Sequence, residues 1–298
     1  MKNLFIFFCV LLLVSCESKV QKEYFKNGSI KKEFVLKDGM YDGKLNEYYD
    51  SGDLKEVHIY SNGMKIDSSL YFEKDGKLNY VEYHHGDTTY SNYRKYYYPD
   101  NSIKSEGIYS KLGLPIGKWR YYNEENGYLE EVKEIQNVNG EPHLNQNWSF
   151  DKNGDTLFDR STYLLLHFLK DTISIEEAVT VYAELKYPLF KNKESSIMAV
   201  VPNDNSEDFN EDFSNLEFIQ PDTTYNLNIE EEYRLEAGMA EGDYKHDVIF
   251  GRYYNSPGPK KFRGIIVEYF KTDTLTKDSL NFFEHKIYFE KEIYVKGE

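Results

Sequence analysis

A seven-residue phrase, Tyr24-Phe25-Lys26-Asn27-Gly28-Ser29-Ile30, recurs along the first half of the chain and constrains its fold more than any other feature. Each copy has aromatic residues, then a turn position that favours glycine, then an aliphatic residue. The turn positions are 24 to 27 residues apart, and they are Gly28, Gly52, Gly76, Asn101, Gly127 and Gly154. A period of this length indicates a stack of structural repeats.

Most repeats contain a second turn, at Asp38-Gly39, Asn62-Gly63, His85-Gly86 or Asn139-Gly140. These pairs predict tight β-hairpins, because such turns need positive φ angles that glycine adopts without strain. Each repeat is therefore predicted as two short strands. One hairpin cannot bury its own aromatic residues, so the sequence predicts an antiparallel β-repeat sheet in which neighbouring units cover one another.

The aromatic residues of the repeats have two interpretations. They fill the interior of the sheet, or some of them form a face that stacks on a sugar or a peptide. Adjacent residues of a strand point to opposite faces, so neighbouring aromatic residues cannot all point inward. We expect Tyr49, Tyr97 and Tyr122, or their immediate neighbours, to be binding residues on such a face.

The repeated phrase, and Gly117-Lys118-Trp119-Arg120-Tyr121-Tyr122 in particular, resembles MORN-type repeats, in the variant found in bacterial YwqK-family antitoxins. The resemblance covers about half of the chain. It implies an elongated antiparallel sheet rather than a catalytic pocket. On this basis residues 23–158 are expected to form a MORN-like repeat domain.

The N-terminus is predicted to be a bacterial export signal over residues 1–15. Lys2 precedes an apolar run, Leu4 to Val14, that is too short to span a bilayer. The run ends in Leu13-Val14-Ser15-Cys16, which resembles a lipobox and implies that Cys16 is lipidated. We expect residues 16–22 to form the lipid anchor and a short tether to an envelope membrane, with the outer membrane favoured. A plain secretory signal or a short N-terminal anchor is the alternative.

Residues 159–298 lose the repeat and are predicted to form a β-sandwich of broadly immunoglobulin-like outline. Alternating apolar residues mark its clearest strands, as at Val179, Val181, Ala183 and Leu185. The predicted strand regions are Thr162 to Leu169, Ala178 to Leu185, Ile197 to Val201, Asp247 to Tyr254, Gly264 to Phe270 and His285 to Val295. A helix from Ile175 to Tyr187, capped by Ser174, is the competing prediction.

Composition and motifs argue against several classes of function. Cys9 would leave with the signal and Cys16 would carry lipid, so no cysteine chemistry is expected in the folded part. The net charge of −15 disfavours nucleic acid as a partner. The sequence contains no standard nucleotide-binding, serine-hydrolase or zinc-protease motif. We therefore expect no enzyme, no catalytic residues and no cofactor.

Two segments carry residues of the kind that bind metals. His84 and His85 lie near Asp87, but adjacent residues of a strand point apart, which favours an exposed turn. Residues 203–212 carry oxygen donors at alternating positions, as a calcium-binding loop does. They depart from the EF-hand pattern, with Phe209 in the place of its glycine and Asn215 in the place of its last glutamate. We expect a solvated loop there and no metal site, and we leave calcium binding open.

Six Asp-Ser/Thr segments resemble acceptor sites for O-linked glycans on exported proteins of Bacteroidota. The implied acceptors are Thr88, Thr156, Thr172, Thr223, Thr274 and Ser279. Asp-Thr also favours turns on its own account, so the pattern has a purely structural explanation as well.

Together these features predict a lipid-anchored envelope protein whose aromatic repeat sheet is a binding or scaffold module. The expected partner, besides the membrane, is an envelope protein or a glycan. The family resemblance suggests an alternative, an antitoxin or immunity-type protein that neutralises a toxin by direct contact.

Overall fold

The computed structural model describes residues 19–84, 92–271 and 282–297. The predicted export signal and Cys16 lie outside these residues. Residues 1–89 and 90–298 form two compact units, and each is described by itself. In the described part of the chain, no helix is long and apolar enough to cross a membrane.

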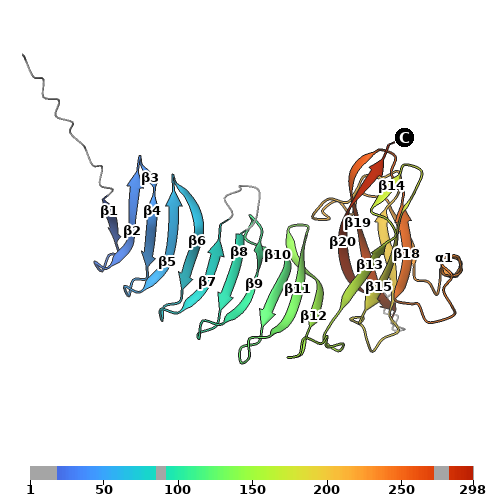
Figure 1. Ribbon diagram of the computed structural model, residues 1–298, viewed down its shortest axis with the longest axis horizontal. Coiled ribbons are helices and arrows are strands. Elements are labelled where there is room, and N and C mark those ends of the chain that lie inside the picture. Colours follow the sequence, from blue (N-terminus) through green and yellow to red (C-terminus); the bar gives the residue numbers. More distant parts are fainter. Residues whose placement is uncertain (1–18, 85–91, 272–281, 298) are drawn as a thin grey trace, which may run out of the picture. The chain divides into compact units, whose positions relative to one another are not determined.

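The N-terminal half of the chain forms a twelve-stranded antiparallel sheet among the described residues, with β3 off its main path and paired with β2 (Figure 1). Residues 1–89 contribute β1 (Val20–Tyr24), β2 (Ile30–Lys37), β3 (Met40–Tyr41), β4 (Gly43–Tyr48), β5 (Leu54–Ser61), β6 (Met64–Phe72) and β7 (Leu78–Tyr83). Residues 90–298 contribute β8 (Asn92–Tyr97), β9 (Ile103–Tyr109), β10 (Pro115–Tyr122), β11 (Leu129–Val138) and β12 (Glu141–Ser149). The predicted antiparallel sheet in this half is confirmed.

The repeated glycine positions lie in one kind of turn. In the first turn, the carbonyl of Phe25 accepts the N–H of Gly28 at 3.0 Å, and the N–H of Phe25 donates to the carbonyl of Ser29 at 2.8 Å. The same two bonds close the turns at Gly52, Gly76, Asn101 and Gly154, and the turn at Gly127 is one residue wider. All six positions have φ between 67° and 95°, which glycine adopts most easily and asparagine next.

A β-bulge precedes five of these turns, because the strand pairing shifts by one residue at the end of the strand. The bulge makes the last residue of each strand structurally equivalent from one repeat to the next. These equivalent residues are Tyr24, Tyr48, Phe72, Tyr97 and Tyr122.

Two of these bulge tyrosines hydrogen-bond to a glutamate on a neighbouring strand of the sheet. The hydroxyl of Tyr48 donates to Glu33 at 2.7 Å, and the hydroxyl of Tyr122 donates to Glu106 at 2.7 Å. Burial, followed by the hydrogen bond to Glu106, raises the pKa of Tyr122 to about 12. Each glutamate also pairs with a lysine on its other side, Lys22 at 2.7 Å and Lys95 at 3.4 Å.

In the repeat between β5 and β6, the same two positions carry Val57 and Phe72. Val57 lies opposite Leu70, two residues before the bulge, just as Glu33 lies opposite Asn46 two residues before Tyr48. In this repeat the valine therefore occurs together with a phenylalanine, which has no hydroxyl, whereas Tyr48 and Tyr122 each donate their hydroxyl to a glutamate carboxylate.

Trp119 packs directly on Gly107 in the neighbouring strand. Its side chain is only 3% exposed, and a Cβ atom added to Gly107 would lie 2.4 Å from the indole ring. The indole Nε1–H donates to the carbonyl of Ile108 at 3.2 Å. The absence of a side chain at position 107 thus makes room for the ring against the sheet.

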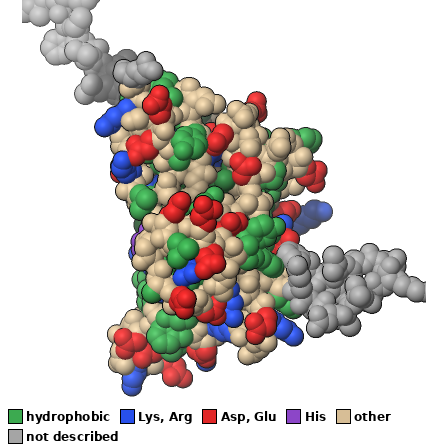
Figure 2. Space-filling model, turned by 90° about the vertical axis from the view of Figure 1, so that its right-hand side faces the viewer, with side chains coloured by type: hydrophobic (Ala, Val, Ile, Leu, Met, Phe, Trp, Pro, Cys, Tyr) green, Lys and Arg blue, Asp and Glu red, His purple; other side chains and the backbone are tan. Residues whose placement is uncertain are grey.

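The remaining strands form two smaller sheets. Figure 2 faces the right-hand side of Figure 1 and shows acidic and basic side chains interspersed on that surface. One sheet has the order β13 (Tyr163–Phe168), β15 (Val179–Lys186) and β18 (Asp247–Arg252). The other has the order β14 (Thr172–Ser174), β20 (Phe282–Lys296), β19 (Gly258–Lys271), β16 (Ser196–Pro202) and β17 (Pro221–Tyr225). A short helix, α1 (Glu231–Glu236), lies between β17 and β18, and β14 pairs with β20 in parallel.

One hydrophobic core is shared by these two sheets. The three-stranded sheet contributes Val181 and Phe250, and the five-stranded sheet contributes Phe262 and Ile287. Burial in β15 alternates residue by residue, as the sequence predicts for a strand with one face on a core. The competing helix over residues 175–187 is wrong, because the β-branched residues of this segment are accommodated in β15.

Residues 203–220, which we call the covering loop, lie over the five-stranded sheet. Phe209 and Phe213 are 2% and 3% exposed and pack with Ile265, Val267 and Tyr288 in a second hydrophobic cluster. The covering loop also reaches the last repeat hairpin, where the N–H of Asn139 donates to the carbonyl of Asp212 at 2.7 Å. The segment that the sequence predicts to be a solvated loop is therefore anchored by two buried aromatic residues.

The last repeat hairpin is fixed to the five-stranded sheet through Asn145, which is 0% exposed. Its amide donates to the carbonyl of Tyr288 at 2.8 Å and accepts the N–H of Tyr288 at 2.7 Å. This side chain therefore pairs with the edge of β20 as the backbone of a neighbouring strand would. Nearby, His143 Nε2 lies 2.9 Å from the carbonyl of Lys286.

Candidate functional site

Four aromatic side chains of residues 90–298 lie together on one face of the repeat sheet, which we call the aromatic face. Its residues are Tyr96, Tyr109, Trp119 and Tyr121. The ring of Trp119 lies 5.1 Å from Tyr109 and 6.2 Å from Tyr96, and the hydroxyls of Tyr96 and Tyr109 share a 3.1 Å hydrogen bond. The register places Tyr96 and Tyr121 on the same side, because both lie opposite Ser105.

The other compact unit has an equivalent row of rings. Phe34 contacts Tyr41 at 5.3 Å, Tyr41 contacts Tyr60 at 5.1 Å, and Tyr71 stacks on Tyr80 at 4.1 Å. The rings in this row are half-buried or buried by their neighbours on the same face. Both units therefore present a face of adjoining aromatic rings.

Basic side chains lie over several of these rings. The guanidinium of Arg94 is 4.0 Å from the ring centre of Tyr109, and Lys133 Nζ is 4.9 Å from that of Tyr121. Burial, followed by the hydrogen bond with Tyr96, raises the pKa of Tyr109 to about 12. The ring therefore stays neutral at physiological pH, and its electron-rich surface attracts the cation.

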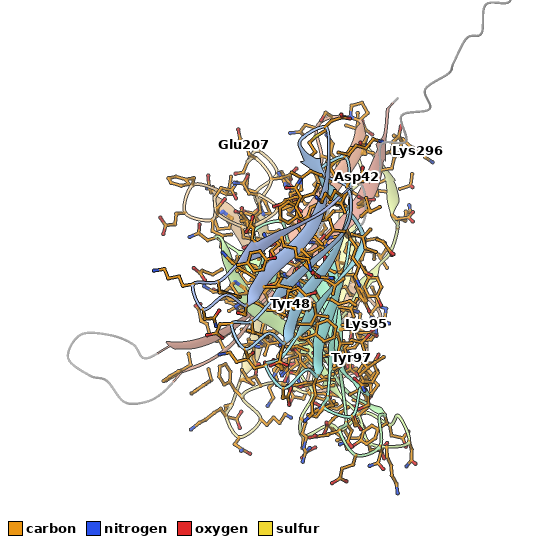
Figure 3. All side chains as sticks on the ribbon, turned by 90° about the vertical axis from the view of Figure 1, so that its left-hand side faces the viewer. Asp42, Tyr48, Lys95, Tyr97, Glu207 and Lys296 are labelled. Carbon is orange, nitrogen blue, oxygen red and sulfur yellow. The ribbon has the colours of Figure 1, made fainter. Side chains whose placement is uncertain are left out.

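The three aromatic residues predicted to bind a partner do not occupy equivalent places. Tyr97 and Tyr122 are bulge residues. Tyr97 is on β8, the strand that also carries Lys95, and it lies opposite Ile103 of β9 (Figure 3). Tyr49 lies one position later, in the turn, where its hydroxyl donates to the carbonyl of Phe72 at 2.8 Å. Lys74 Nζ lies 5.7 Å from its ring.

Two residues of the aromatic face are the immediate neighbours of predicted ones. Tyr121 and Tyr122 are adjacent, yet Tyr121 lies with Lys133 and Tyr122 with Glu106, on opposite faces of the sheet. Tyr96 and Tyr97 are adjacent in the same way, and Tyr96 is the one that lies on the aromatic face. The alternation rule places Tyr121 on the face of Trp119, because the two residues are two positions apart in β10, and the pairing of Tyr96 and Tyr121 with Ser105 adds Tyr96 to that face.

The predicted modification sites are only partly covered by the structure. Cys16, Thr88, Thr274 and Ser279 lie outside the described residues. Thr223 is exposed on β17, whereas Thr156 and Thr172 are half-buried. Thr172 donates its hydroxyl to Asp171 at 3.3 Å.

Three aspartates of the acidic loop bind protein groups. Asp204 accepts the N–H of Tyr253 at 2.9 Å, and Asp208 forms an ion pair with Arg252. Asp212 accepts hydrogen bonds from the N–H and the hydroxyl of Ser214, at 3.1 and 2.7 Å. Within residues 19–84, 92–271 and 282–297, no three His, Cys, Asp or Glu side chains gather as metal ligands would.

Two serine–histidine–glutamate groups were not anticipated from the sequence. In the first, Glu56 lies 3.1 Å from His58 Nε2, and His58 Nδ1 lies 2.7 Å from the hydroxyl of Ser69. The same hydroxyl lies 2.7 Å from His84 Nε2, so the histidine considered as a metal ligand is bound within the sheet.

In the second group, His246 Nε2 lies 3.0 Å from the hydroxyl of Ser195, and Ser195 also bonds to Glu268. Glu268 accepts the backbone N–H groups of Leu189 and Phe190, both at 2.9 Å. Burial acts to raise the pKa of Glu268, but the hydrogen bonds that it accepts outweigh burial and lower it.

Nucleophilic catalysis requires a serine hydroxyl that a substrate can reach. Ser69 is 0% exposed and Ser195 is 1% exposed, so both hydroxyls are enclosed by the protein. Both groups act as hydrogen-bond networks that join strands or loops. Contacts between residues far apart in the sequence create them, which explains why no local motif reveals them.

A comparison with models of protein families and with curated proteins finds no match for this chain. Its function is therefore argued from its own residues.

Proposed function

We propose that this chain is a non-enzymatic binding or scaffold module, and that the aromatic face of residues 90–298 binds a protein partner. The observation that carries the proposal is the group of adjoining rings, Tyr96, Tyr109, Trp119 and Tyr121, with Arg94 placed on Tyr109. Tyrosine, tryptophan and arginine are the residues that contribute most to protein–protein binding energy.

The form of the surface favours a protein over a glycan as the partner. Small ligands are usually held in concave sites that cover most of their surface. The aromatic face lies on a sheet, and the buried ring of Trp119 packs against the half-buried tyrosines Tyr96 and Tyr109. Rigid tyrosines on such a support lose little conformational entropy on binding.

The setting that we propose is the one implied by the sequence, a bacterial lipoprotein anchored through Cys16, with the outer membrane favoured. We further propose that residues 23–158 are MORN-type repeats, supported by their common turn and bulge geometry. For residues 159–298 we propose an immunoglobulin-like β-sandwich, supported by the core that the two sheets share. An immunity-type protein is a special case of this proposal, in which the partner is a toxin.

Site-specific photocrosslinking in the native cell tests the proposed surface. A photoreactive phenylalanine derivative is placed at Tyr121, on the aromatic face, or at Tyr122, on the opposite face. The two positions are adjacent, similarly buried and identical in the native side chain, so Tyr122 is a matched control.

We expect a discrete protein adduct from position 121 that is weaker or absent from position 122. The adduct should also weaken when Arg94 is replaced by alanine. Equal crosslinking from both positions, or none from position 121, would contradict the proposed face. Membrane fractionation of Cys16→Ser tests the anchor separately, and the variant is expected to leave the membrane fraction.

A further inference from the structure

Large apolar side chains are exposed at one end of the hairpins in residues 1–89, which we call the methionine end. They are Val20 at the start of β1, Met40 in β3 and Met64 at the start of β6, which are 54%, 47% and 65% exposed. The turns at the opposite end of these strands expose polar residues and glycine at their tips, residues 26–28, 50–53 and 73–77. The two ends of the hairpins therefore differ in their chemistry.

Strand pairing brings the start of β1 to the methionine end. Val20 lies opposite Val35, two residues before β2 ends at Lys37. Met40 of β3 lies directly opposite Lys37, so Val20 and Met40 are at the same end of β2. Figure 1 shows β3 at this end of the sheet.

The turn that carries Met40 adjoins the turn that carries Met64. The N–H of Gly63 donates to the carbonyl of Tyr41 at 2.8 Å. A Cβ atom added to Gly63 would lie 3.5 Å from Cβ and 3.6 Å from Sδ of Met40, which is ordinary van der Waals contact. Met40 therefore packs on the residue that precedes Met64, and the two methionines form one apolar patch.

The chain before β1 indicates what this patch faces. Val20 is four residues after Cys16, the residue on which we propose a lipid. An extended chain covers at most about 3.6 Å per residue, so the Cα atoms of Cys16 and Val20 are no more than about 14 Å apart. β5 has eight residues and is about 27 Å long, so the opposite turns lie about one strand length farther away. Of the two ends, the methionine end is the one that such an anchor holds near the bilayer.

Exposed lysines accompany the apolar side chains. They are Lys19 before β1, Lys37 at the end of β2 and Lys44 in β4. None of the three forms an ion pair within residues 19–84. Asp38 and Asp42, the latter labelled in Figure 3, lie at the same end and offset part of this positive charge. A contact with lipid would therefore depend mainly on the apolar side chains, with the lysines reaching towards the phosphate groups.

We propose that the methionine end rests on the lipid bilayer, with Val20, Met40 and Met64 inserted at the level of the headgroups; this proposal rests on the anchor at Cys16. Apolar side chains gain free energy on leaving water, and methionine adapts its shape to irregular surroundings. Three side chains bind a bilayer weakly by themselves, but a lipid that keeps them at its surface raises their effective concentration. The repeat strands of residues 1–89 then stand away from the membrane instead of lying along it.

A fluorescent label on the full-length lipidated chain tests this contact in vesicles. Cys9 is expected to leave with the export signal and Cys16 to carry lipid, so one introduced cysteine can be labelled alone. The label, nitrobenzoxadiazole, is placed by Met64→Cys or by Ser51→Cys, an exposed position in a turn at the opposite end of the same strands. The vesicles are phosphatidylcholine, with or without phosphatidylglycerol, and contain phosphatidylcholine with a nitroxide on its acyl chain as the quencher.

We expect the emission at position 64 to shift to the blue, and the nitroxide lipid to quench it at least about threefold more strongly than at position 51. Quenching at position 64 should fall about twofold or more with Met40→Ser, because an apolar contact is lost, and should persist with Met40→Leu. Phosphatidylglycerol should change these results little.

Flotation of the vesicles separates the contact from the anchor. If the chain floats with the vesicles but position 64 is unquenched, or positions 64 and 51 are quenched equally, the contact is overturned and the anchor stands. Unchanged quenching in Met40→Ser would also overturn the insertion. A chain that does not float with the vesicles would overturn the anchor, and the contact with it.

Discussion

Replacing Gly107 by alanine tests the packing of Trp119 on the repeat sheet. The added Cβ would lie 2.4 Å from the indole ring, whereas ordinary contact begins at 3.4 Å. The ring therefore has to retreat by about 1 Å. Because Tyr96 and Tyr109 pack against the same ring, the displacement would reach the aromatic face.

The expected loss of stability follows from three contributions. Adding one carbon to a close-packed site costs about 1–3 kcal/mol. Stretching the hydrogen bond from the Trp119 indole to Ile108 costs up to about 1 kcal/mol. The reduced backbone freedom of alanine in the unfolded chain returns about 0.5–1 kcal/mol. We therefore expect Gly107→Ala to lower the free energy of unfolding by about 1–3 kcal/mol.

Urea unfolding followed by circular dichroism measures this loss, and a double-mutant cycle assigns it to Trp119. In a Trp119→Leu background the ring is absent, so Gly107→Ala should cost less than in the wild type by at least about 1 kcal/mol. The reasoning is refuted if Gly107→Ala is as stable as the wild type. It is also refuted if the alanine costs the same in both backgrounds.

Three further predictions concern a buried amide, a turn and pH. Asn145→Ala should destabilise the chain by about 2–4 kcal/mol in urea unfolding, since both backbone groups of Tyr288 lose their partner; a loss below about 0.5 kcal/mol would contradict this. Asn101→Val should destabilise by about 1–2 kcal/mol at φ 67°, whereas Asn101→Gly should stay within about 0.5 kcal/mol of the wild type; equal effects would exclude backbone strain as the cause. Burial lowers the pKa of His246 below its ordinary 6.5, so between that value and the lower folded pKa the unfolded state binds more protons. The melting temperature of the wild type should therefore fall from pH 7 towards pH 5, and it should fall less in His246→Gln. Below about pH 4.5 it should fall further, because the pKa of Glu268 is lowered in the folded state. A melting temperature unaffected by pH would contradict this.

Local chemistry predicts the parts of this fold that depend on short segments. An Asn-Gly pair favours a tight turn with positive φ at both residues, so the turns at Asn62-Gly63 and Asn139-Gly140 follow from the sequence. The alternation in β15 follows in the same way, because a strand with one buried face needs an apolar residue at every second position.

Other features depend on residues that are far apart in the sequence and could not be predicted. The composition of residues 203–212 indicates exposure, yet Phe209 is buried because it meets Ile265 and Val267. Asn145 resembles any polar residue of a strand, and its role exists only because Tyr288 lies 143 residues later. Tyr109 and Trp119 adjoin only because β9 and β10 pair in this register, and no short segment of the sequence shows that contact.

One repeat has the pair Glu33 and Tyr48, and the next has Val57 and Phe72 at the equivalent positions. This difference helps each strand of a repeated chain to pair with its correct neighbour. Strands with the same phrase every 24 residues can pair one whole repeat out of place while keeping their turns and apolar pattern. Such a shift would set Glu33 beside Phe72, leaving a half-buried carboxylate without the hydroxyl that it needs, at a cost of about 1–3 kcal/mol. The difference between the two pairs therefore distinguishes the repeat that contains Glu33 from the one that contains Val57, and a chain made of identical units would lose this protection against misaligned folding.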